Sequence, residues 1–238
     1  FSSETAIAVA PVVDKVRINP GNFHQDHDKA RAQFARLLEV CREHHTAIRI
    51  GLNHGSLGSY ITNLYGNTPL AMAKAAMEWI EMCVAADFND VVISLKSSNT
   101  IVMVEAYRTL SRLMSEAGTV FPLHVGVTEA GNGDSGRIKS CVGISALLSE
   151  GIGNTLRVSL TEDPVNEIYV GQYLADRYDH RISSSMTGMS VSGKSVTATY
   201  DAPSRERLLL DFSCDFGKRL LDREIDEVTI CGTYLDAE

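Results

Sequence analysis

Four basic residues occupy similar places in four apolar segments of the sequence. Arg17, Arg49 and Arg157 each stand between two aliphatic residues, and Lys96 closes a fourth apolar segment. A charge inside a core strand is costly unless it is paired or neutralised. If the four side chains instead point into one cavity, they form an anion site, because a guanidinium matches phosphate oxygens in a bidentate way. We therefore expect a phosphate-binding cavity.

Other roles for these residues stay open at this point. Each Arg could pair with a neighbouring carboxylate in a structural layer of the protein. Lys96 could form a Schiff base with a carbonyl substrate, as in aldolase-type barrels. Glu129 could be an acid–base group or an acceptor for substrate hydroxyls, and it could equally be the partner of one of the Arg residues.

Apolar strands alternate with amphipathic helices over the first 175 residues. Strands are expected at 15–19, 47–52, 91–95, 122–127 and 155–160, and helices at 26–45, 68–86, 100–116, 137–149 and after Pro164. This order implies βαβ units, a parallel sheet and a site at the carboxyl ends of the strands. The predicted fold class is α/β, with the C-terminal five βα units of a TIM-type (β/α)8 barrel that is truncated.

The pattern changes after residue 175. Residues 180–191 and 195–200 are expected to form a hairpin around a turn at 192–194, followed by a helix at 203–222 and a strand at 227–230. We expect residues 1–175 to be a partial barrel that binds the substrate. Residues 176–238 are expected to be the remnant of an inserted α/β domain.

Polar turns that contain glycine follow several of the predicted strands. They lie at 19–22, 53–56 and 129–133. Their amide and hydroxyl groups can bind anions, and glycine allows a close approach of the backbone. We expect them to form a polar rim around the basic cavity.

Composition limits the possible partners. The 238 residues carry a net charge of −8, which argues against a general affinity for nucleic acid or anionic membranes. The longest apolar run, at 6–13, is too short to span a bilayer. Five scattered cysteines without a C-x-x-C pair favour a reduced, cytoplasmic protein with no metal site in this chain.

Five segments, taken in order, resemble one enzyme family. They are 16–22 (VRINPGN), 49–57 (RIGLNHGSL), 94–99 (SLKSSN), 124–131 (HVGVTEAG) and 157–162 (RVSLTE). They resemble the 4-hydroxy-3-methylbut-2-enyl diphosphate synthases, iron–sulfur enzymes of the non-mevalonate isoprenoid pathway, and in particular the larger, three-domain variant. The likeness covers about residues 1–175.

The resemblance implies a reductive dehydration. The cyclic diphosphate of methylerythritol is ring-opened and loses an oxygen, with two electrons delivered from ferredoxin or flavodoxin through a [4Fe–4S] cluster. It also implies that Glu129 lies near the reacting carbons as a catalytic residue. The implied substrate-binding residues are Arg17, Asn19, Arg49, Asn53, His54, Lys96, Arg157 and Ser159.

The chain also departs from the family pattern. The family holds its cluster on a C-terminal domain with three cysteine ligands, and we expect that domain, and so the cluster ligands, to be missing from this chain. We therefore expect a fragment that is inactive alone. Family members often act as homodimers, so a homodimer is a further expectation.

Overall fold

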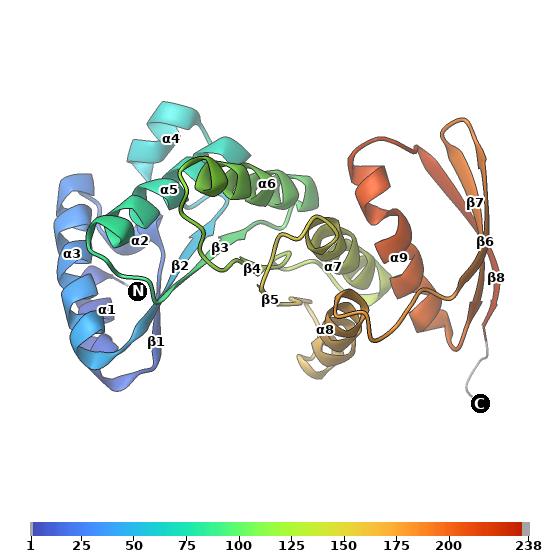
Figure 1. The fold of residues 1–238 in the computed structure, drawn as a ribbon, viewed down its shortest axis with the longest axis horizontal. Helices are drawn as coiled ribbons and strands as arrows, with labels where there is room; N and C mark the ends of the chain where they lie inside the picture. The colour runs from blue at the N-terminus through green and yellow to red at the C-terminus, as the bar shows by residue number, and fades with distance from the viewer. Residues whose placement is uncertain (1, 235–238) are drawn as a thin grey trace. The chain divides into compact units, whose positions relative to one another are not determined.

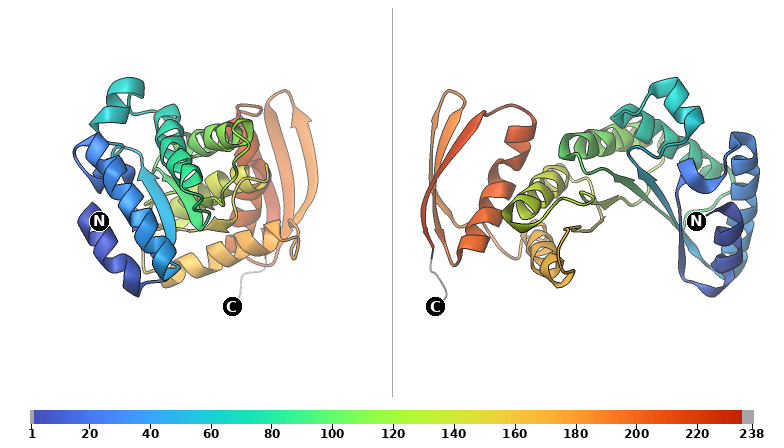
Figure 2. Two further views of the ribbon diagram at one scale, coloured as in Figure 1. Left: turned by 60° about the vertical axis from the view of Figure 1, so that its left-hand side comes forward. Right: turned by 180° about the vertical axis from the view of Figure 1, so that it is seen from behind.

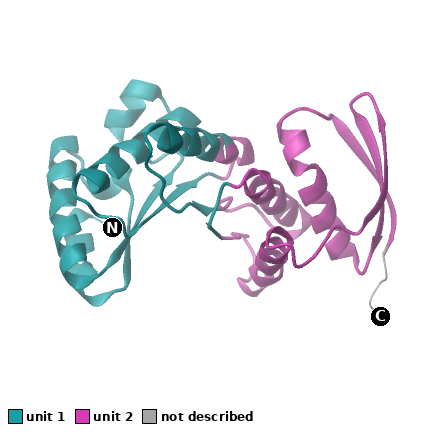
Figure 3. Ribbon diagram, viewed as in Figure 1, with its two compact units in different colours: residues 1–97, 105–125, 152–155 teal, residues 98–104, 126–151, 156–238 magenta. Residues whose placement is uncertain are grey.

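The computed structural model describes residues 2–234 of the chain. Their contacts divide them into two compact units, each of which is described by itself (Figure 3). Unit 1 comprises residues 2–97, 105–125 and 152–155, and unit 2 comprises residues 98–104, 126–151 and 156–234. Among these residues, the model contains no helix of the length and apolar character that a membrane span requires.

Unit 1 is built on a parallel sheet of three strands, in the order β1, β2 and β3 (Figure 1). The strands are β1 (Lys15–Ile18), β2 (Ala47–Asn53) and β3 (Val91–Lys96), followed by the short pair β4 (His124–Val125) and β5 (Thr155–Leu156). Around them lie α1 (Ser3–Val9), the 3-10 turn η1 (Ala10–Val12), α2 (Pro20–Phe23), α3 (His27–His44), α4 (Ser59–Tyr65), α5 (Pro69–Ala85) and α6 (Thr100–Glu116). A single parallel bridge between Ile93 and Leu123 links β3 to the segment before β4.

The mixed α/β architecture is the one expected from the sequence. Each expected strand range contains a strand, although β4 and β5 have only two residues each. The expected helix at 68–86 begins with a cap that a Thr-Pro pair favours: the Thr68 hydroxyl accepts a hydrogen bond from the amide of Ala71, and Pro69 opens the first turn. Gly118 follows the end of α6 with a φ of 66°, which glycine adopts without steric cost.

Two short helices were not expected. α2 begins directly after β1, where the Asn19 side chain accepts a hydrogen bond from the amide of Gly21 and so caps the helix. α4 lies between Gly58 and Gly66, which both have a positive φ. Each of these helices is shorter than the ten or so residues that hydrophobic periodicity can detect.

The core of unit 1 lies on one face of the sheet. Every second residue of the three strands is aliphatic and buried, namely Val16, Ile18, Ile48, Ile50, Leu52, Ile93 and Leu95. α1 packs on β1, and α5 packs on β2 and β3. α1 and α3 lie together on one side of this sheet in both views (Figures 1 and 2). Because side chains alternate along a strand, the other face must carry the remaining residues.

The Tyr107 hydroxyl links β3 to β4 where the strand ladder is interrupted. Tyr107 belongs to α6, and its side chain is fully buried. The hydroxyl accepts a hydrogen bond from the amide of Leu95 at 2.8 Å and donates one to the carbonyl of His124 at 2.6 Å. Burial raises the pKa of Tyr107, so the group stays a neutral donor.

Unit 2 combines three helices with a small sheet. The helices are α7 (Gly133–Leu148), α8 (Val165–Tyr178) and α9 (Arg205–Leu221), and the strands are β6 (Met186–Ser192), β7 (Ser195–Ala202) and β8 (Glu227–Tyr234). β6 pairs antiparallel with β7 as the expected hairpin, and β8 pairs parallel with β7. α9 and the sheet share a core of Val196, Ala198, Tyr200, Ala202, Leu208, Phe216 and Ile225. The expected domain boundary after residue 175 stays a prediction.

A buried carboxylate joins α8 and α9 in unit 2. Asp211 is fully buried and accepts hydrogen bonds from the Tyr173 hydroxyl at 2.6 Å and from the Arg177 guanidinium at 3.0 Å. It also accepts from Arg207 Nε at 3.0 Å and from the amide of Ser185 at 3.0 Å. The two guanidinium groups neutralise a charge that burial would otherwise make very costly.

We expect the substitution Asp211→Ala to lower the free energy of unfolding by about 3–5 kcal/mol, because it removes the buried carboxylate that Arg177 and Arg207 share. Urea unfolding followed by circular dichroism measures the change. The control is Asp226→Ala, which removes an exposed ion pair with Lys194 and should change stability by less than about 1 kcal/mol. Equal effects of the two substitutions would contradict a structural role for the Asp211 network.

We expect Tyr107→Phe to destabilise unit 1 by about 1–3 kcal/mol, since the amide of Leu95 and the carbonyl of His124 lose their buried partner. The chain has a single tryptophan, Trp79, which is buried in unit 1, so its fluorescence reports unfolding of that unit. Tyr60→Phe is the matched control, because the Tyr60 side chain is half-exposed. A change no larger than that of the control would show that the bridge contributes nothing.

Candidate functional site

The second face of the unit 1 sheet carries most of the polar residues expected at the site. The residues that alternate with the apolar core come from all three strands. They are Arg17 in β1 and Asn19 directly after it; Arg49, Gly51 and Asn53 in β2; and Val92, Ser94 and Lys96 in β3. Arg17 lies opposite Arg49 in the strand register, and Asn53 lies opposite Lys96. The structure therefore brings three of the four expected basic residues to one face of one sheet.

Arg17 is one of the two expected arginines in a row across β1 and β2. Its terminal nitrogen donates a hydrogen bond to the carbonyl of Gly51 at 3.3 Å. The side chain contacts no carboxylate within ion-pair distance among residues 2–234. The alternative in which each arginine pairs with its own carboxylate therefore does not apply to Arg17.

Arg49 faces a cavity of about 430 Å³ at the start of the strands. Lys15, Asp90 and His124 also line this cavity. The His124 ring is hydrogen-bonded through Nδ1 to the Thr155 hydroxyl at 2.8 Å. Arg49 thus lines a hollow with both signs of charge, nearer the amino ends of the strands than the expectation had placed it.

The loops that follow β1 and β2 are joined to each other. The Asn19 side chain donates a hydrogen bond to the Ser56 hydroxyl at 3.1 Å, and that hydroxyl donates to the carbonyl of Asn53 at 3.3 Å. A Cβ atom on Gly21 would lie 2.0 Å from the carbonyl oxygen of Ser56, so only glycine fits this contact. The close approach expected of these turns is present at Gly21, and it fixes the position of Asn19.

β3 joins the same arrangement through the backbone. The amide of His54 donates a hydrogen bond to the carbonyl of Lys96 at 2.8 Å. The His54 ring lies 3.2 Å, through Nε2, from the carbonyl oxygen of Asn67, and the Asn67 side chain accepts from the amide of Gly55. These contacts give His54 a structural task in the loop between β2 and α5 that the sequence did not indicate.

The remaining expected site residues belong to unit 2. Ser159 is buried, and its hydroxyl accepts a hydrogen bond from the amide of Glu129 at 3.4 Å. The carbonyl of Ser159 accepts from the amide of Ala130 at 2.9 Å. Glu129 and Arg157 are exposed and form no ion pair among the described residues. The pairing of Glu129 with an arginine, which the sequence left open, is therefore absent from this part of the chain.

Glu129 has an unusual backbone conformation. Its φ of 49° lies in the left-handed region, which side chains other than glycine rarely adopt. Local strain of this kind persists where the surrounding structure enforces it, and it is common at functional sites. The hydrogen bonds from the amides of Glu129 and Ala130 to Ser159 hold the backbone in this conformation.

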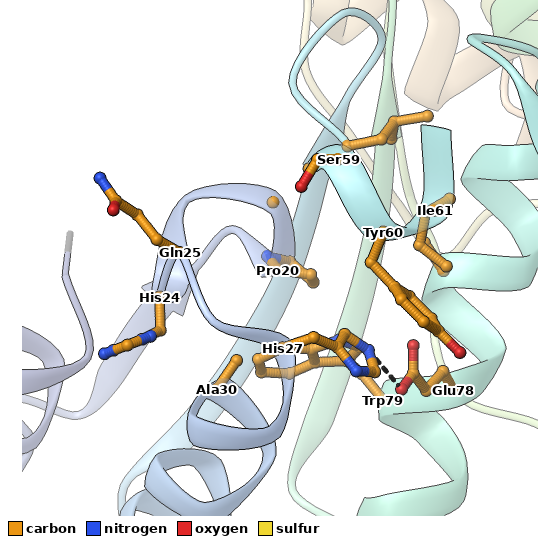
Figure 4. A pocket seen from close by; sticks show the side chains of 14 residues that line it. Pro20, His24, Gln25, His27, Ala30, Ser59, Tyr60, Ile61, Glu78 and Trp79 are labelled. Atoms are coloured by element: carbon orange, nitrogen blue, oxygen red, sulfur yellow. Dashed lines mark ion pairs between the residues drawn. The ribbon is translucent and has the colours of Figure 1, made fainter. Parts of the chain in front are cut away.

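A second cavity in unit 1 is lined by none of the expected site residues. It has a volume of about 390 Å³, and Figure 4 shows its labelled side chains. His27 lies 2.8 Å from Glu78, and the Tyr60 ring stacks on His27 with the ring centroids 3.8 Å apart. His24 and Gln25 point away from this group in the view (Figure 4). The sequence did not predict this cavity, because α4 and α5 approach His27 only in the folded chain.

The cysteines do not form a ligand set among the described residues. That part of the chain contains no group of three or more His, Cys, Asp or Glu side chains that could hold a metal ion. A hydrogen bond to Cys214 and burial together raise the pKa of Cys141, so the Cys141 thiol stays protonated. The residues described here therefore do not fit a [4Fe–4S] cluster.

Comparisons with known proteins identify the family of this chain. Residues 1–172 match the family model described as the GcpE TIM-barrel domain. The proteins named 4-hydroxy-3-methylbut-2-en-1-yl diphosphate synthase (flavodoxin) include one from Phocaeicola vulgatus that is 50% identical over 193 residues, 74% of this chain and 31% of that protein. Those from Parabacteroides distasonis and Leptospira interrogans are 47% and 43% identical, over 78% and 77% of this chain and 34% and 30% of their own lengths. The aligned part of the chain thus spans about a third of the length of these relatives, and by its match over 172 of its 238 residues the chain belongs to the GcpE TIM-barrel domain family.

Proposed function

We propose that this chain supplies the substrate-binding part of a 4-hydroxy-3-methylbut-2-enyl diphosphate synthase, an oxidoreductase of isoprenoid biosynthesis. The reaction opens the ring of 2-C-methyl-D-erythritol 2,4-cyclodiphosphate, takes up two electrons and two protons and releases water, giving 4-hydroxy-3-methylbut-2-enyl diphosphate. The observation that carries the proposal is the row of basic residues on the polar face of the unit 1 sheet. The names of the relatives favour this function over a Lys96 aldolase, a pterin-type synthase or a binding domain without activity.

The chemistry of the substrate explains why basic residues are needed. A cyclic diphosphate carries negative charge on its phosphate oxygens, and breaking one of its two bonds to carbon adds charge to the diphosphate, which stays attached to the product through the other bond. Cations fixed near that position before the reaction stabilise the developing charge. In this proposal Arg17, Arg49 and Lys96 hold the diphosphate together with Arg157. Asn19, Asn53, His54 and Ser159 orient it through hydrogen bonds.

Glu129 is proposed as the catalytic residue near the reacting carbons. Its carboxylate is exposed and without an ion pair among the described residues. It is therefore available to accept a proton, or a hydrogen bond from a substrate hydroxyl. The left-handed backbone at Glu129 supports the assignment, because strained backbone conformations of this kind cluster at functional sites.

We propose that residues 1–175 form five βα units of a TIM-type barrel and that residues 176–238 derive from a second α/β domain. The family match that ends at residue 172 supports the boundary. The separate core of β7, β8 and α9 supports a second folding module.

The electrons are proposed to come from flavodoxin, which the names of the relatives specify, with ferredoxin as the alternative. A [4Fe–4S] cluster would supply the electron transfer in the whole enzyme. Since the described residues do not fit this cluster, we place its ligands outside them and assign no step of the transfer to this chain. A homodimer is a further part of the proposal.

We expect Arg49→Ala to weaken binding of the cyclic diphosphate to the 238-residue chain by about 1.5–3 kcal/mol, the contribution of a charge-assisted hydrogen bond. Isothermal titration calorimetry measures it. Arg112→Ala, which removes an exposed arginine paired with Glu116 in α6, is the control and should leave the affinity unchanged. Unchanged affinity for Arg49→Ala would assign Arg49 to the structure rather than to the substrate.

We expect no covalent labelling of Lys96 when the chain is treated with sodium borohydride and a small carbonyl substrate, because in this proposal the lysine acts as a cation. Peptide mass spectrometry after proteolysis detects a reduced adduct. A stoichiometric adduct on Lys96, absent without the carbonyl compound, would support the aldolase alternative instead.

A further inference from the structure

Gly51 lies in the middle of the polar face, between two rows of site residues. In the strand register Arg17 and Arg49 form one row, Gly51 and Ser94 form the next, and Asn53 and Lys96 form the third. Successive rows on one face of a strand are about 6.6 Å apart. A side chain from the first row must therefore cross the second row to approach the third.

The guanidinium of Arg17 occupies the space that a side chain at Gly51 would take. A Cβ atom placed on Gly51 would lie 2.8 Å from Arg17 Nε and 3.5 Å from its terminal nitrogen, while Ser94 Oγ would lie 3.1 Å away. The same terminal nitrogen donates a hydrogen bond to the carbonyl of Gly51 at 3.3 Å. The Arg17 side chain thus bends out of its own row and lies across β2.

The backbone at this position does not require glycine. Gly51 lies within the regular β2 ladder and is absent from the residues with a positive φ, unlike Gly55 and Gly58 in the loop that follows. A side chain is excluded here by space alone, and the atoms nearest to it belong to a flexible side chain rather than to a backbone. An alanine at this position would therefore displace Arg17 and leave the strand in place.

Repulsion between two arginines gives a physical reason for the bend of the Arg17 side chain. Arg17 and Arg49 are direct partners in the register, and like charges opposite each other on neighbouring strands repel. By turning across Gly51, the Arg17 guanidinium leaves the row that it shares with Arg49, while Arg49 lines the cavity at the start of the strands. The open space above Gly51 thus lets Arg17 lie outside the row that the register assigns to both arginines.

We infer that Gly51 is a positioning residue that sets where the Arg17 guanidinium meets an anionic ligand. The inference rests on the proposed function, in which Arg17 binds the diphosphate. Gly51 itself makes no contact with the ligand in this account. Its contribution is the missing side chain, and so it must depend on the presence of Arg17.

A double-mutant cycle tests this dependence. The variants are Gly51→Ala, Arg17→Ala and the double substitution in the 238-residue chain, and the probe is inorganic diphosphate titrated by calorimetry. We expect Gly51→Ala and Arg17→Ala each to weaken binding by roughly 10- to 100-fold. The double variant should bind no more weakly than Arg17→Ala alone, because residues that act through one interaction are not additive.

The control for the glycine substitution is Gly171→Ala in α8, where an added Cβ would meet only ordinary contacts at 3.8 Å. It should leave the affinity for diphosphate unchanged. The thermal midpoints of all variants are measured as a second readout. If Gly51→Ala lowers the midpoint, removal of Arg17 should restore it, since the clash is with that side chain. Failure of both proteins that carry Gly51→Ala to fold would overturn the inference, because the strand itself would then need glycine.

The remaining outcomes separate the two proposals. If Arg17→Ala weakens binding and Gly51→Ala does not, or if their effects add in the double variant, the positioning role of Gly51 is wrong while the proposed site stands. If Arg17→Ala leaves the affinity for diphosphate unchanged, the assignment of Arg17 to the diphosphate fails, and the inference about Gly51 fails with it.

Discussion

The parallel pairing of β1, β2 and β3 is the interaction on which the rest of unit 1 depends. Because side chains alternate along each strand, the register that buries Ile48 and Ile50 under the helices also turns Arg49 to the other face. A shift of one residue would bury the arginines and expose the core. The hydrophobic side of the sheet therefore determines which face the cations occupy.

The loops add what the ladder cannot provide. β1 ends opposite Ile50, whereas β2 continues to Asn53. Contacts between the backbone and short polar side chains hold the loops that follow the two strands. The Gly21 contact with Ser56 and the hydrogen bonds of Asn19 join the first two loops, and the amide of His54 ties the second loop to β3. Rigid loops of this kind keep polar groups in position before a ligand arrives, which reduces the entropy lost on binding.

Much of the fold could be predicted from the sequence, because the signals were local. The strand at Val91–Lys96, the cap at Thr68 and the hairpin before Ala202 all follow from patterns within a few residues. The features that were missed depend on contacts between distant segments. The α4 helix is too short to show a period, and the space above Gly51 exists only because Arg17 comes from another strand. The cavity that Arg49 lines likewise forms only where Asp90 and His124 come together in the folded chain.

Arginines in different parts of the folded chain have different roles. Arg177 is held by Asp211 and Asp215, and Arg137 is held by Glu162, whose pKa is lowered by that hydrogen bond. These side chains have no capacity left for a ligand, because their charge is already compensated by a carboxylate. Arg17 has only a backbone carbonyl as its partner among residues 2–234. A carbonyl oxygen directs a guanidinium without neutralising it. Arg17 therefore keeps its full charge for an anion, which is the property that separates a binding arginine from a structural one.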